Sequence, residues 1–465
     1  MKTRFFIYLT GFFLLGLALW TERFFGRVSI DQALWTINFG AKGVLAADSI
    51  FLKRFIIWAI IWPIILSIIF LLAERFITPR MRFTAPLFLL AGVLYFSYEY
   101  HAIDYFQKSR VRDKDYFFLN YVDANQQHFS AKNPKSLILI YVESLENNYA
   151  KPELFGHDLL KKLTHLQNNH VSFSQYQQVS GTGWTMGGLV STQCAVPLKS
   201  LTIMGNNRVG ENVSYFLPKV KCLGDILAEA GYKNIFMEGS SLFVGGKGKF
   251  LENHHYSERI GTDEWFAKGY PVSGMTWWGL PDDLLIHEAK LKFDKLMQDK
   301  QPFNLTILTV DMHGVSGQIS PTCKSRGQTD FKGIVECTCD LVADLVNYMI
   351  DHHALARANI IVMGDHLAMS NDVIDVLQKT PRTIFNVIIT RDKLHKHRET
   401  IVHFDWLPTI LDTLGFEYSS HKLGLGVSAF VEDTNRQAKN ALAHVEKQAS
   451  YESEFYNQLW IPKQA

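Results

Sequence analysis

The stretch Ser136–Val142, SLILIYV, is a continuous apolar run that ends directly in Glu143 and Ser144. Such a run, with its β-branched residues, is typical of a strand buried on both faces of a parallel sheet. Four further segments have the same character: Asn234–Met237, Phe303–Val310, Asn359–Met363 and Thr383–Ile389. Helical patterns lie between them, at Leu223–Ala230, Asp283–Met297 and Cys339–His352. This alternation predicts an α/β sheet with helices on both faces.

The chain before this region is strongly apolar. Three runs carry no charge: Phe5–Thr21, Phe55–Ala73 and Phe83–Tyr98. A helix needs about 20 apolar residues to cross a hydrocarbon core, and interfacial aromatic residues can extend the two shorter runs. The first run could instead be a signal peptide, but no small-residue cleavage site follows it. We therefore expect three transmembrane helices, with residues 28–52 lying on the membrane.

Basic residues in the short loops predict the orientation. Lys2 and Arg4 precede the first run, and Arg75, Arg80 and Arg82 separate the second from the third. The positive-inside rule places both segments in the cytoplasm. The loop 22–54 also carries basic residues, which reduces the difference in basic residues between the two sides of the membrane. We expect a multi-pass membrane protein with its α/β part on the extracytoplasmic side.

Four parts are expected along the chain: a membrane region at 1–100, a polar connector at 101–135, the α/β domain at 136–434 and a helical or disordered tail at 435–465. The chain has 465 residues and a net charge of +2. This balance provides no basic field for a nucleic-acid backbone, so we expect no nucleic-acid partner.

All five cysteines lie in the C-terminal part: Cys194, Cys222, Cys323, Cys337 and Cys339. They form no zinc-ribbon pattern, and Cys337-Thr-Cys339 is one residue short of a CxxC redox motif. In an oxidising compartment we expect the pairs Cys194–Cys222 and Cys323–Cys337, with Cys339 left over. Five free thiols would require the reverse orientation in the membrane.

Polar residues follow three of the predicted strands. Glu143 follows the first, Asp311 and His313 follow another, and Asp365 and His366 follow a third. Ligands of open α/β sheets bind outside the carboxyl ends of the strands. Each residue alone is typical of a cap or a surface position, but the three groups together favour a metal site. Carboxylate oxygens and an imidazole suit Mn²⁺ or Mg²⁺, with Zn²⁺ also possible.

The glycine-rich segment Ser180–Gly188, SGTGWTMGG, predicts a tight turn that enters a helix. Thr185 would then lie at the helix N-terminus, where backbone N–H groups favour an anion. A hydroxyl there, coordinated to a divalent cation, can become a nucleophile. An N-capping threonine is the commoner case. Thr182 competes for either role, and the spacing alone does not choose between the two threonines.

Several motifs occur together and in a fixed order. They are YVESLE from Tyr141, GTGWTM from Gly181, Cys194, MGDHLAM from Met363 and HFDWLPTIL from His403. In combination, over roughly Ser136 to Gly426, they resemble the phosphoglycerol transferase and lipoteichoic acid synthase family. That family belongs to the sulfatase-like branch of the alkaline phosphatase superfamily, and the likeness is greatest to its membrane-bound members that decorate periplasmic glucans. The resemblance implies a mixed sheet sandwiched by helices, preceded by a transmembrane region. It also implies the bacterial inner (plasma) membrane, with the α/β part in the periplasm.

The resemblance also implies roles for individual residues. Four of them match the metal-binding positions of the family: Glu143, Thr185, Asp365 and His366. Thr185 matches the nucleophile of the family, which decides between it and Thr182. The family uses one divalent metal ion, for which we expect Mn²⁺ before Mg²⁺ or Zn²⁺.

Three further residues resemble substrate-binding positions. His313 resembles a histidine that contacts the phosphoglycerol headgroup, and Lys247 lies near a basic headgroup residue. Trp278, in the segment WWGLPDD, resembles an aromatic segment of the glucan enzymes, although a packed tryptophan is the commoner role. His403 and Asp405 resemble residues that support the site, and the position of Asp405 before an apolar run also predicts a helix N-cap.

One departure from the superfamily bears on the activity. Sulfatases require Cys/Ser-x-Pro-x-Arg, whereas Cys194-Ala-Val-Pro-Leu-Lys has its proline one position late and lacks the arginine. The resemblance implies instead that glycerol phosphate moves from phosphatidylglycerol to a glycan hydroxyl of the periplasm or cell surface, through a phosphothreonine intermediate. Two alternatives stay open. One is a phosphoethanolamine transferase acting on lipopolysaccharide or another envelope acceptor. The other is a non-catalytic membrane protein that binds lipid or glycan, which has no need of a complete Glu/Thr/Asp/His set.

Overall fold

A six-stranded sheet forms the centre of the computed structural model, which describes residues 2–26, 28–35, 49–76, 84–109, 116–199, 215–437 and 441–461. The strand order is β4-β3-β5-β1-β6-β7, and all neighbouring strands are parallel except β6 and β7. The strands are β1 (Ser136–Val142), β3 (Lys233–Glu238), β4 (Glu258–Ile260), β5 (Phe303–Leu308), β6 (Ala358–Gly364) and β7 (Asn386–Ile389). The expected mixed sheet is therefore confirmed.

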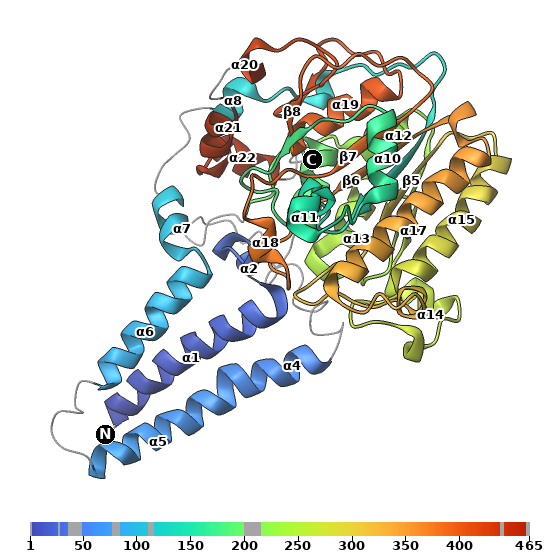
Figure 1. Ribbon diagram of the computed structural model, residues 1–465. Helices are drawn as coiled ribbons and strands as arrows, with labels where there is room; N and C mark the ends of the chain where they lie inside the picture. The colour runs from blue at the N-terminus through green and yellow to red at the C-terminus, as the bar shows by residue number, and fades with distance from the viewer. Residues whose placement is uncertain are drawn as a thin grey trace.

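Helices cover both faces of this sheet, because successive side chains of a strand point to opposite faces. Leu137 and Leu139 of β1 face one hydrophobic core, together with α11 (Thr185–Cys194), α12 (Leu223–Glu229) and α19 (Trp406–Thr413). Ile138 and Ile140 face the other core, together with α10 (Lys161–Asn169), α15 (Asp282–Gln298) and α17 (Phe331–Asp351). Figure 1 shows α15 and α17 side by side on one flank of the sheet.

The helix α17 begins at Phe331, earlier than the predicted start at Cys339. Its N-cap is Asp330, whose side chain accepts a hydrogen bond of 2.8 Å from the backbone N–H of Gly333. Phe331 and Ile334 are buried in the core, so the apolar face of the helix already starts there. The earlier start follows from this cap, a signal that the sequence carries in the aspartate before the apolar run.

The N-terminal helices extend away from the α/β body as a stalk (Figure 1). They are α1 (Lys2–Phe25), a continuous rod of α4 (Ser49–Phe55), the π-helical turn η2 (Ile56–Ile61) and α5 (Trp62–Phe76), and α6 (Thr84–Glu99). Two segments, Lys2–Phe25 and Leu52–Glu74, are long and apolar enough to cross a membrane. The sixteen-residue α6 packs along α1, and its crossing of the membrane stays a prediction. The loops 36–48 and 77–83, which the orientation argument uses, lie outside the described residues.

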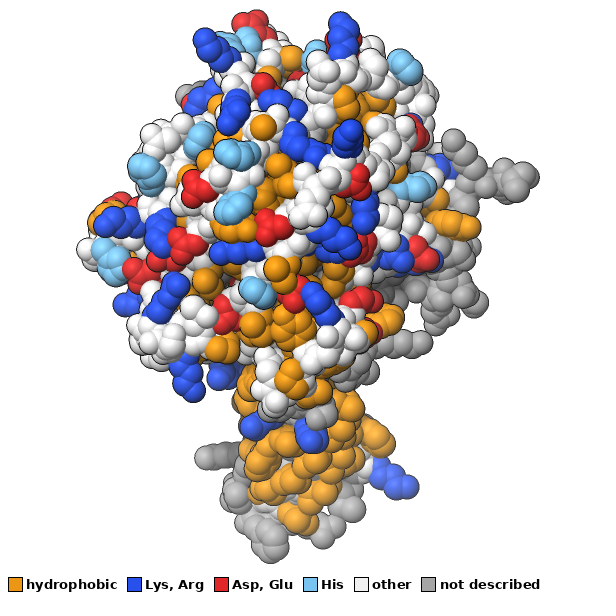
Figure 2. Space-filling view, turned by 90° about the vertical axis from the view of Figure 1, so that its right-hand side faces the viewer, with side chains coloured by type: hydrophobic (Ala, Val, Ile, Leu, Met, Phe, Trp, Pro, Cys, Tyr) orange, Lys and Arg blue, Asp and Glu red, His pale blue; other side chains and the backbone are white. Residues whose placement is uncertain are grey.

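The surface and the interior of the stalk both suit a lipid environment. Hydrophobic side chains cover its outside, and Ile69, Leu87 and Leu94 are each more than half exposed (Figure 2). Inside, a Cβ atom at Gly16 would lie 2.0 Å from the carbonyl oxygen of Trp58, so only glycine permits this approach of α1 to η2. Arg4 donates to Glu74 at 2.9 Å near the far end of the stalk.

The segments outside the sheet pack onto the α/β body. The connector region contains α7 (Ala102–Ser109) and α8 (Tyr116–Asn120), and the C-terminal segment forms α20 (Thr434–Gln437), α21 (Ala441–Ser450) and α22 (Glu454–Leu459). Phe117 of α8 and Tyr456 of α22 are in contact in the core, with ring centroids 5.6 Å apart. The segment 435–465 is thus helical over much of its described length and contributes to the core.

The disulfides agree with the expected pairs. Cys194 is bonded to Cys222 and Cys323 to Cys337, whereas Cys339 is free and buried. The first bond joins the end of α11 to the residue before α12. It therefore fixes the helix that begins with Thr185.

We predict that one cysteine of the five reacts with an alkylating reagent when the membrane-inserted protein is denatured without reductant. The four bonded sulfurs are protected, and mass spectrometry of the labelled chain counts the reactive thiols. After reduction, all five should be labelled. Cys339→Ala is the matched control and should leave no label before reduction. Five labelled cysteines without reductant would contradict the periplasmic orientation.

Candidate functional site

Two neighbouring strands and one helix bring four of the predicted residues together. Val142 and Gly364, at the ends of β1 and β6, are directly paired, so Glu143 and Asp365 leave the sheet side by side. His366 follows Asp365, and one ligand atom from each of these three residues lies within 4.8 Å of the others. Thr185 is the first residue of α11. Its hydroxyl donates to Glu143 Oε2 at 3.3 Å and lies 3.5 Å from His366 Nε2.

Backbone hydrogen bonds orient the ligand atoms. Asp365 Oδ1 accepts from the backbone N–H groups of Ser144 and His366, at 2.8 and 3.0 Å. Asp365 Oδ2 is buried and has no hydrogen-bond partner among the described residues. His366 Nδ1 lies 2.8 Å from the carbonyl oxygen of Leu367, which can only accept. Nδ1 therefore carries a proton, and Nε2 faces the carboxylates.

The helix α11 is held close to the backbone of Asp365. A Cβ atom at Gly188 would lie 2.2 Å from the Asp365 carbonyl oxygen, so the helix can approach this closely only with glycine there. His403 Nε2 lies 2.8 Å from the same carbonyl oxygen. Burial lowers the pKa of His403 to about 3, so the ring is neutral and donates from Nε2. His403 thus holds the backbone of Asp365 in position.

The charges of the site are strongly coupled. Burial opposes ionisation of Glu143, but His313 and His366 outweigh it and lower the pKa of Glu143 to about 2. Burial and the neighbouring Glu143 raise the pKa of Asp365 to about 7. Although burial disfavours a charged His366, the two carboxylates raise its pKa to about 9. Without a cation, protons on His366 and Asp365 therefore offset the negative charge.

This donor set fits a divalent cation. Two carboxylates, one imidazole nitrogen and one hydroxyl lie close together, and Asp365 Oδ2 accepts no hydrogen bond among the described residues, with His366 Nε2 3.4 Å away. A cation would replace the protons on Asp365 and His366, which otherwise offset the negative charge of the site. The mixed oxygen and nitrogen donors suit Mn²⁺, Mg²⁺ or Zn²⁺.

The three expected substrate residues line one cavity of about 120 Å³ next to these groups. His313, Lys247 and Trp278 share its wall with Glu143 and Thr185. The ring centroids of His313 and Trp278 are 4.2 Å apart. Burial lowers the pKa of His313, although the neighbouring Glu143 carboxylate opposes this shift.

Lys247 is bound to a partner that the sequence analysis missed. Its Nζ atom donates to Glu238 Oε2 at 2.6 Å and to Ser240 Oγ at 2.8 Å. Glu238 is the last residue of β3 and lines the same cavity. Its place at the carboxyl end of a buried strand, like that of Glu143, is the signal that could have identified it.

Two other candidates do not face the cavity. The first is Asp311, whose carboxylate accepts a hydrogen bond of 3.2 Å from the backbone N–H of Asp282. The carboxylate of Asp282 in turn accepts one of 2.9 Å from the backbone N–H of Asp311, so the pair ties the segment after β5 to the start of α15. The Thr182 hydroxyl is buried and donates to the carbonyl oxygen of Val179 at 2.7 Å. Thr182 therefore stabilises the turn before α11.

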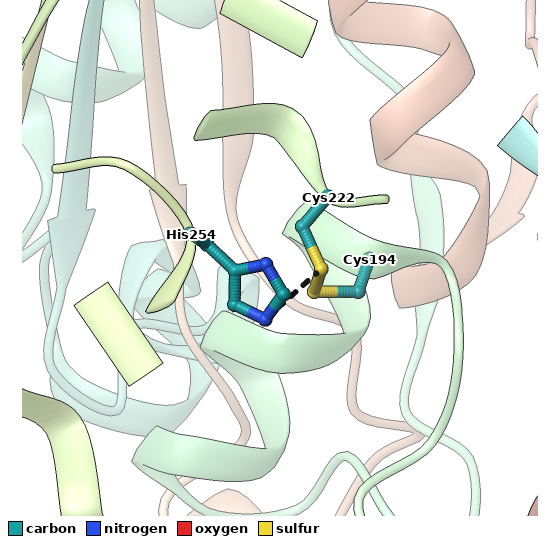
Figure 3. Close-up of side chains that lie close together, drawn as sticks. All are labelled: Cys194, Cys222 and His254. Carbon is teal, nitrogen blue, oxygen red and sulfur yellow. Dashed lines mark hydrogen bonds between the residues drawn. A yellow bond between two sulfur atoms is a disulfide. The ribbon is translucent and has the colours of Figure 1, made fainter. Parts of the chain in front are cut away.

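A second group of possible metal ligands consists of Cys194, Cys222 and His254, at the first disulfide (Figure 3). His254 Nε2 lies 3.7 Å from Cys222 Sγ, and His254 Nδ1 lies 2.8 Å from Asp225 Oδ2. Metal binding by cysteine requires a thiolate. Both sulfurs are used in the Cys194–Cys222 bond, so this group is structural in the oxidised protein.

Comparison with known proteins identifies relatives of the chain. The sulfatase family matches residues 135–416, more than half of the sequence. Phosphoglycerol transferase I of Escherichia coli O6:K15:H31 (strain 536 / UPEC) is 35% identical over 332 residues, which cover 69% of this chain and 42% of that protein. The same enzyme of Escherichia fergusonii is 36% identical over 335 residues, with the same coverage. The chain thus spans about two fifths of the length of these relatives.

Solved structures with a similar backbone include a protein of the alkaline phosphatase superfamily from Vibrio parahaemolyticus. It has a TM-score of 0.49 and 17% identity, and the match covers 65% of this chain and 71% of that one. The lipoteichoic acid synthase LtaP from Listeria monocytogenes has a TM-score of 0.48 and 13% identity, and the match covers 68% and 80% of the two chains.

We predict that Mn²⁺ binding strengthens as the pH rises from 6 to 9. The metal-free site holds a proton on His366 up to about pH 9 and a second on Asp365 up to about pH 7. A cation must displace these protons, so binding should release about one proton at pH 8 and more below pH 7. Isothermal titration in buffers of different ionisation enthalpy measures this release.

Asp365→Ala and His366→Ala should each weaken Mn²⁺ binding, by roughly 100-fold or more, because each removes a ligand. His254→Gln is the control, since it alters the other group of possible ligands, and it should bind Mn²⁺ like the wild type. Equal affinity at pH 6 and pH 9 would contradict the role given to these two residues.

Proposed function

The chain belongs to the sulfatase family, and from this membership we propose that it is a metal-dependent phosphoglycerol transferase. The donor is phosphatidylglycerol, and the acceptor is a hydroxyl of a periplasmic or cell-surface glycan. Thr185 carries the phosphoglyceryl group between them. The juxtaposition of Thr185 with Glu143, Asp365 and His366 is the observation that supports this proposal most directly.

The position of Thr185 supports its role as the nucleophile. Its hydroxyl borders the cavity and donates to Glu143, which orients the oxygen. As the first residue of α11, it lies where free backbone N–H groups and the helix dipole stabilise the charge of a phosphoryl group. A metal held by Glu143, Asp365, His366 and Thr185 would supply Lewis-acid stabilisation of that charge and lower the pKa of the hydroxyl.

Two displacements at phosphorus complete the transfer. Thr185 Oγ1 loses its proton and bonds to the phosphorus, the bond from phosphorus to the diacylglycerol oxygen breaks, and that oxygen takes up a proton as diacylglycerol leaves. An acceptor hydroxyl then loses its proton and bonds to the same phosphorus, and the bond from phosphorus to Thr185 Oγ1 breaks as this oxygen regains a proton. Each step needs a nucleophile in line with the leaving oxygen, so the acceptor enters from the side that diacylglycerol has vacated.

The cavity walls suit a glycerol headgroup. Lys247 is charge-paired with Glu238, which keeps its donors fixed and limits the net charge beside the site. The imidazole of His313 and the indole of Trp278 present hydrogen-bonding and apolar surface to a small polyol. We propose that these residues hold the headgroup while Thr185 attacks.

The stalk supports a position of the cavity beside a membrane. Phe25, the last residue of α1, forms part of the cavity wall and lies against Trp278, with ring centroids 6.5 Å apart. A donor lipid in the outer half of the inner membrane therefore needs to rise only a short way to reach Thr185. This arrangement supports a periplasmic site on a protein of the inner membrane.

We predict that Thr185→Ala lowers diacylglycerol release from fluorescent phosphatidylglycerol by roughly 10³-fold or more, because it removes the hydroxyl that forms the covalent intermediate. The protein is purified in detergent and assayed with Mn²⁺. Mn²⁺ affinity should be largely retained, since three ligands remain. Thr185→Ser should keep measurable activity and accumulate a labelled phosphoglyceryl-serine that mass spectrometry detects.

Thr182→Ala is the control for this experiment, because Thr182 lies in the same turn but its hydroxyl faces Val179. It should lower diacylglycerol release only a few-fold. Release by Thr185→Ala at the rate of the wild type would contradict the nucleophile. If neither the wild type nor any variant releases diacylglycerol, the assay is repeated with phosphatidylethanolamine. Absence of release from both lipids would favour a non-catalytic binding protein.

A further inference from the structure

A second cavity, of about 550 Å³, lies where the stalk meets the α/β body. The stalk contributes Arg23 of α1, Arg54 of α4 and Trp58 of η2, and the body contributes Trp277, Trp278 and the segment 313–319. Both arginines are exposed, and among the described residues no carboxylate lies within ion-pair distance of either guanidinium. Two uncompensated positive charges therefore face one aromatic-walled space.

This junction cavity adjoins the catalytic cavity. Trp278 and His313 belong to the walls of both, so a ligand that enters between the arginines is one side chain away from Thr185 and Glu143. The two cavities are thus consecutive along one path from the stalk to the site.

A separate apolar groove of about 360 Å³ lies farther along the stalk. It runs between α1 and the rod formed by η2 and α5, and its walls include Leu9, Phe13, Ala59, Ile60 and Ile64. Phe13 and Arg23 are ten residues apart on α1, a rise of about 15 Å. That distance matches the depth between acyl chains and a phosphate at the surface of a bilayer.

We infer that the junction cavity is a loading site for an anionic phospholipid, with its acyl chains along the apolar groove and its phosphate between Arg23 and Arg54. Guanidinium groups bind phosphate oxygens through paired, charge-assisted hydrogen bonds. Tryptophan is favoured at the level of lipid headgroups. The occupant is a lipid, not a free phosphate, because the apolar groove lies on the same stalk elements as the two arginines, α1 and the rod of α4, η2 and α5. The inference rests on the proposed function for the identity of the lipid as the donor.

The test measures lipid binding in the Thr185→Ala background, where the donor is not consumed. The full-length protein in detergent is titrated with fluorescent phosphatidylglycerol. We expect the double variant Arg23→Gln, Arg54→Gln to weaken binding roughly tenfold. Lys53→Gln is the matched control, because Lys53 neighbours Arg54 on α4 but does not line the cavity. It should bind within about twofold of its parent, and free glycerol phosphate should not compete.

Conservative substitution guards against a folding defect. The double variant Arg23→Lys, Arg54→Lys retains both charges and should recover part of the affinity that glutamine loses. Unchanged binding of the glutamine variant would overturn the loading site. Equal loss in the Lys53→Gln control, or competition by free glycerol phosphate as strong as that by the lipid, would do the same.

Turnover separates this inference from the proposed function. With Thr185 intact, the glutamine variant should raise the KM for long-chain phosphatidylglycerol about tenfold and leave hydrolysis of a soluble chromogenic phosphodiester unchanged. Equal loss with both substrates would place the arginines in the support of the metal site and overturn the inference. Arginine-dependent lipid binding by a wild type that turns over neither substrate would sustain the loading site and reject the transferase.

Discussion

The pairing of β1 with β6 is the constraint on which the site depends. It forces two carboxylates, Glu143 and Asp365, out of the sheet at adjacent positions in a buried place. Like charges in such surroundings cannot both be stable without compensation. Protons on Asp365 and His366 provide it in the metal-free protein, and a divalent cation can provide it more strongly. The strand register thus creates the concentration of negative charge that a cation would neutralise.

The helix α11 depends on the same corner of the fold. Gly188 lets it approach the Asp365 carbonyl, and the Cys194–Cys222 bond fixes its far end. Thr185, at its first turn, is thereby held against the ligand cluster. Asp365 is held by two further contacts. The imidazole of His403 contacts its carbonyl oxygen, and the backbone N–H of Ser144 donates to its carboxylate.

The stalk has a part in the site as well as in the membrane. Phe25 lines the catalytic cavity, and Arg23 and Arg54 line the one beside it. A phosphotransferase with a lipid donor must move an amphipathic substrate from hydrocarbon to a polar, metal-bearing site. In this chain, the apolar groove, the two arginines and the cavity beside Thr185 succeed one another from the stalk to the α/β body, which is the order that the proposed donor lipid would require.

The sequence by itself determined the sheet, because apolar runs such as SLILIYV are long and clearly bounded, and it identified Glu143, Asp365 and His366, because they directly follow such runs. It could not separate Asp311, which ties β5 to α15, from Glu238, which faces the cavity. Both residues lie at strand ends, and the direction of a side chain there depends on its neighbours in space. Only the tertiary structure brought the arginines of the stalk to the active site, because no local pattern records a contact between residues hundreds of positions apart.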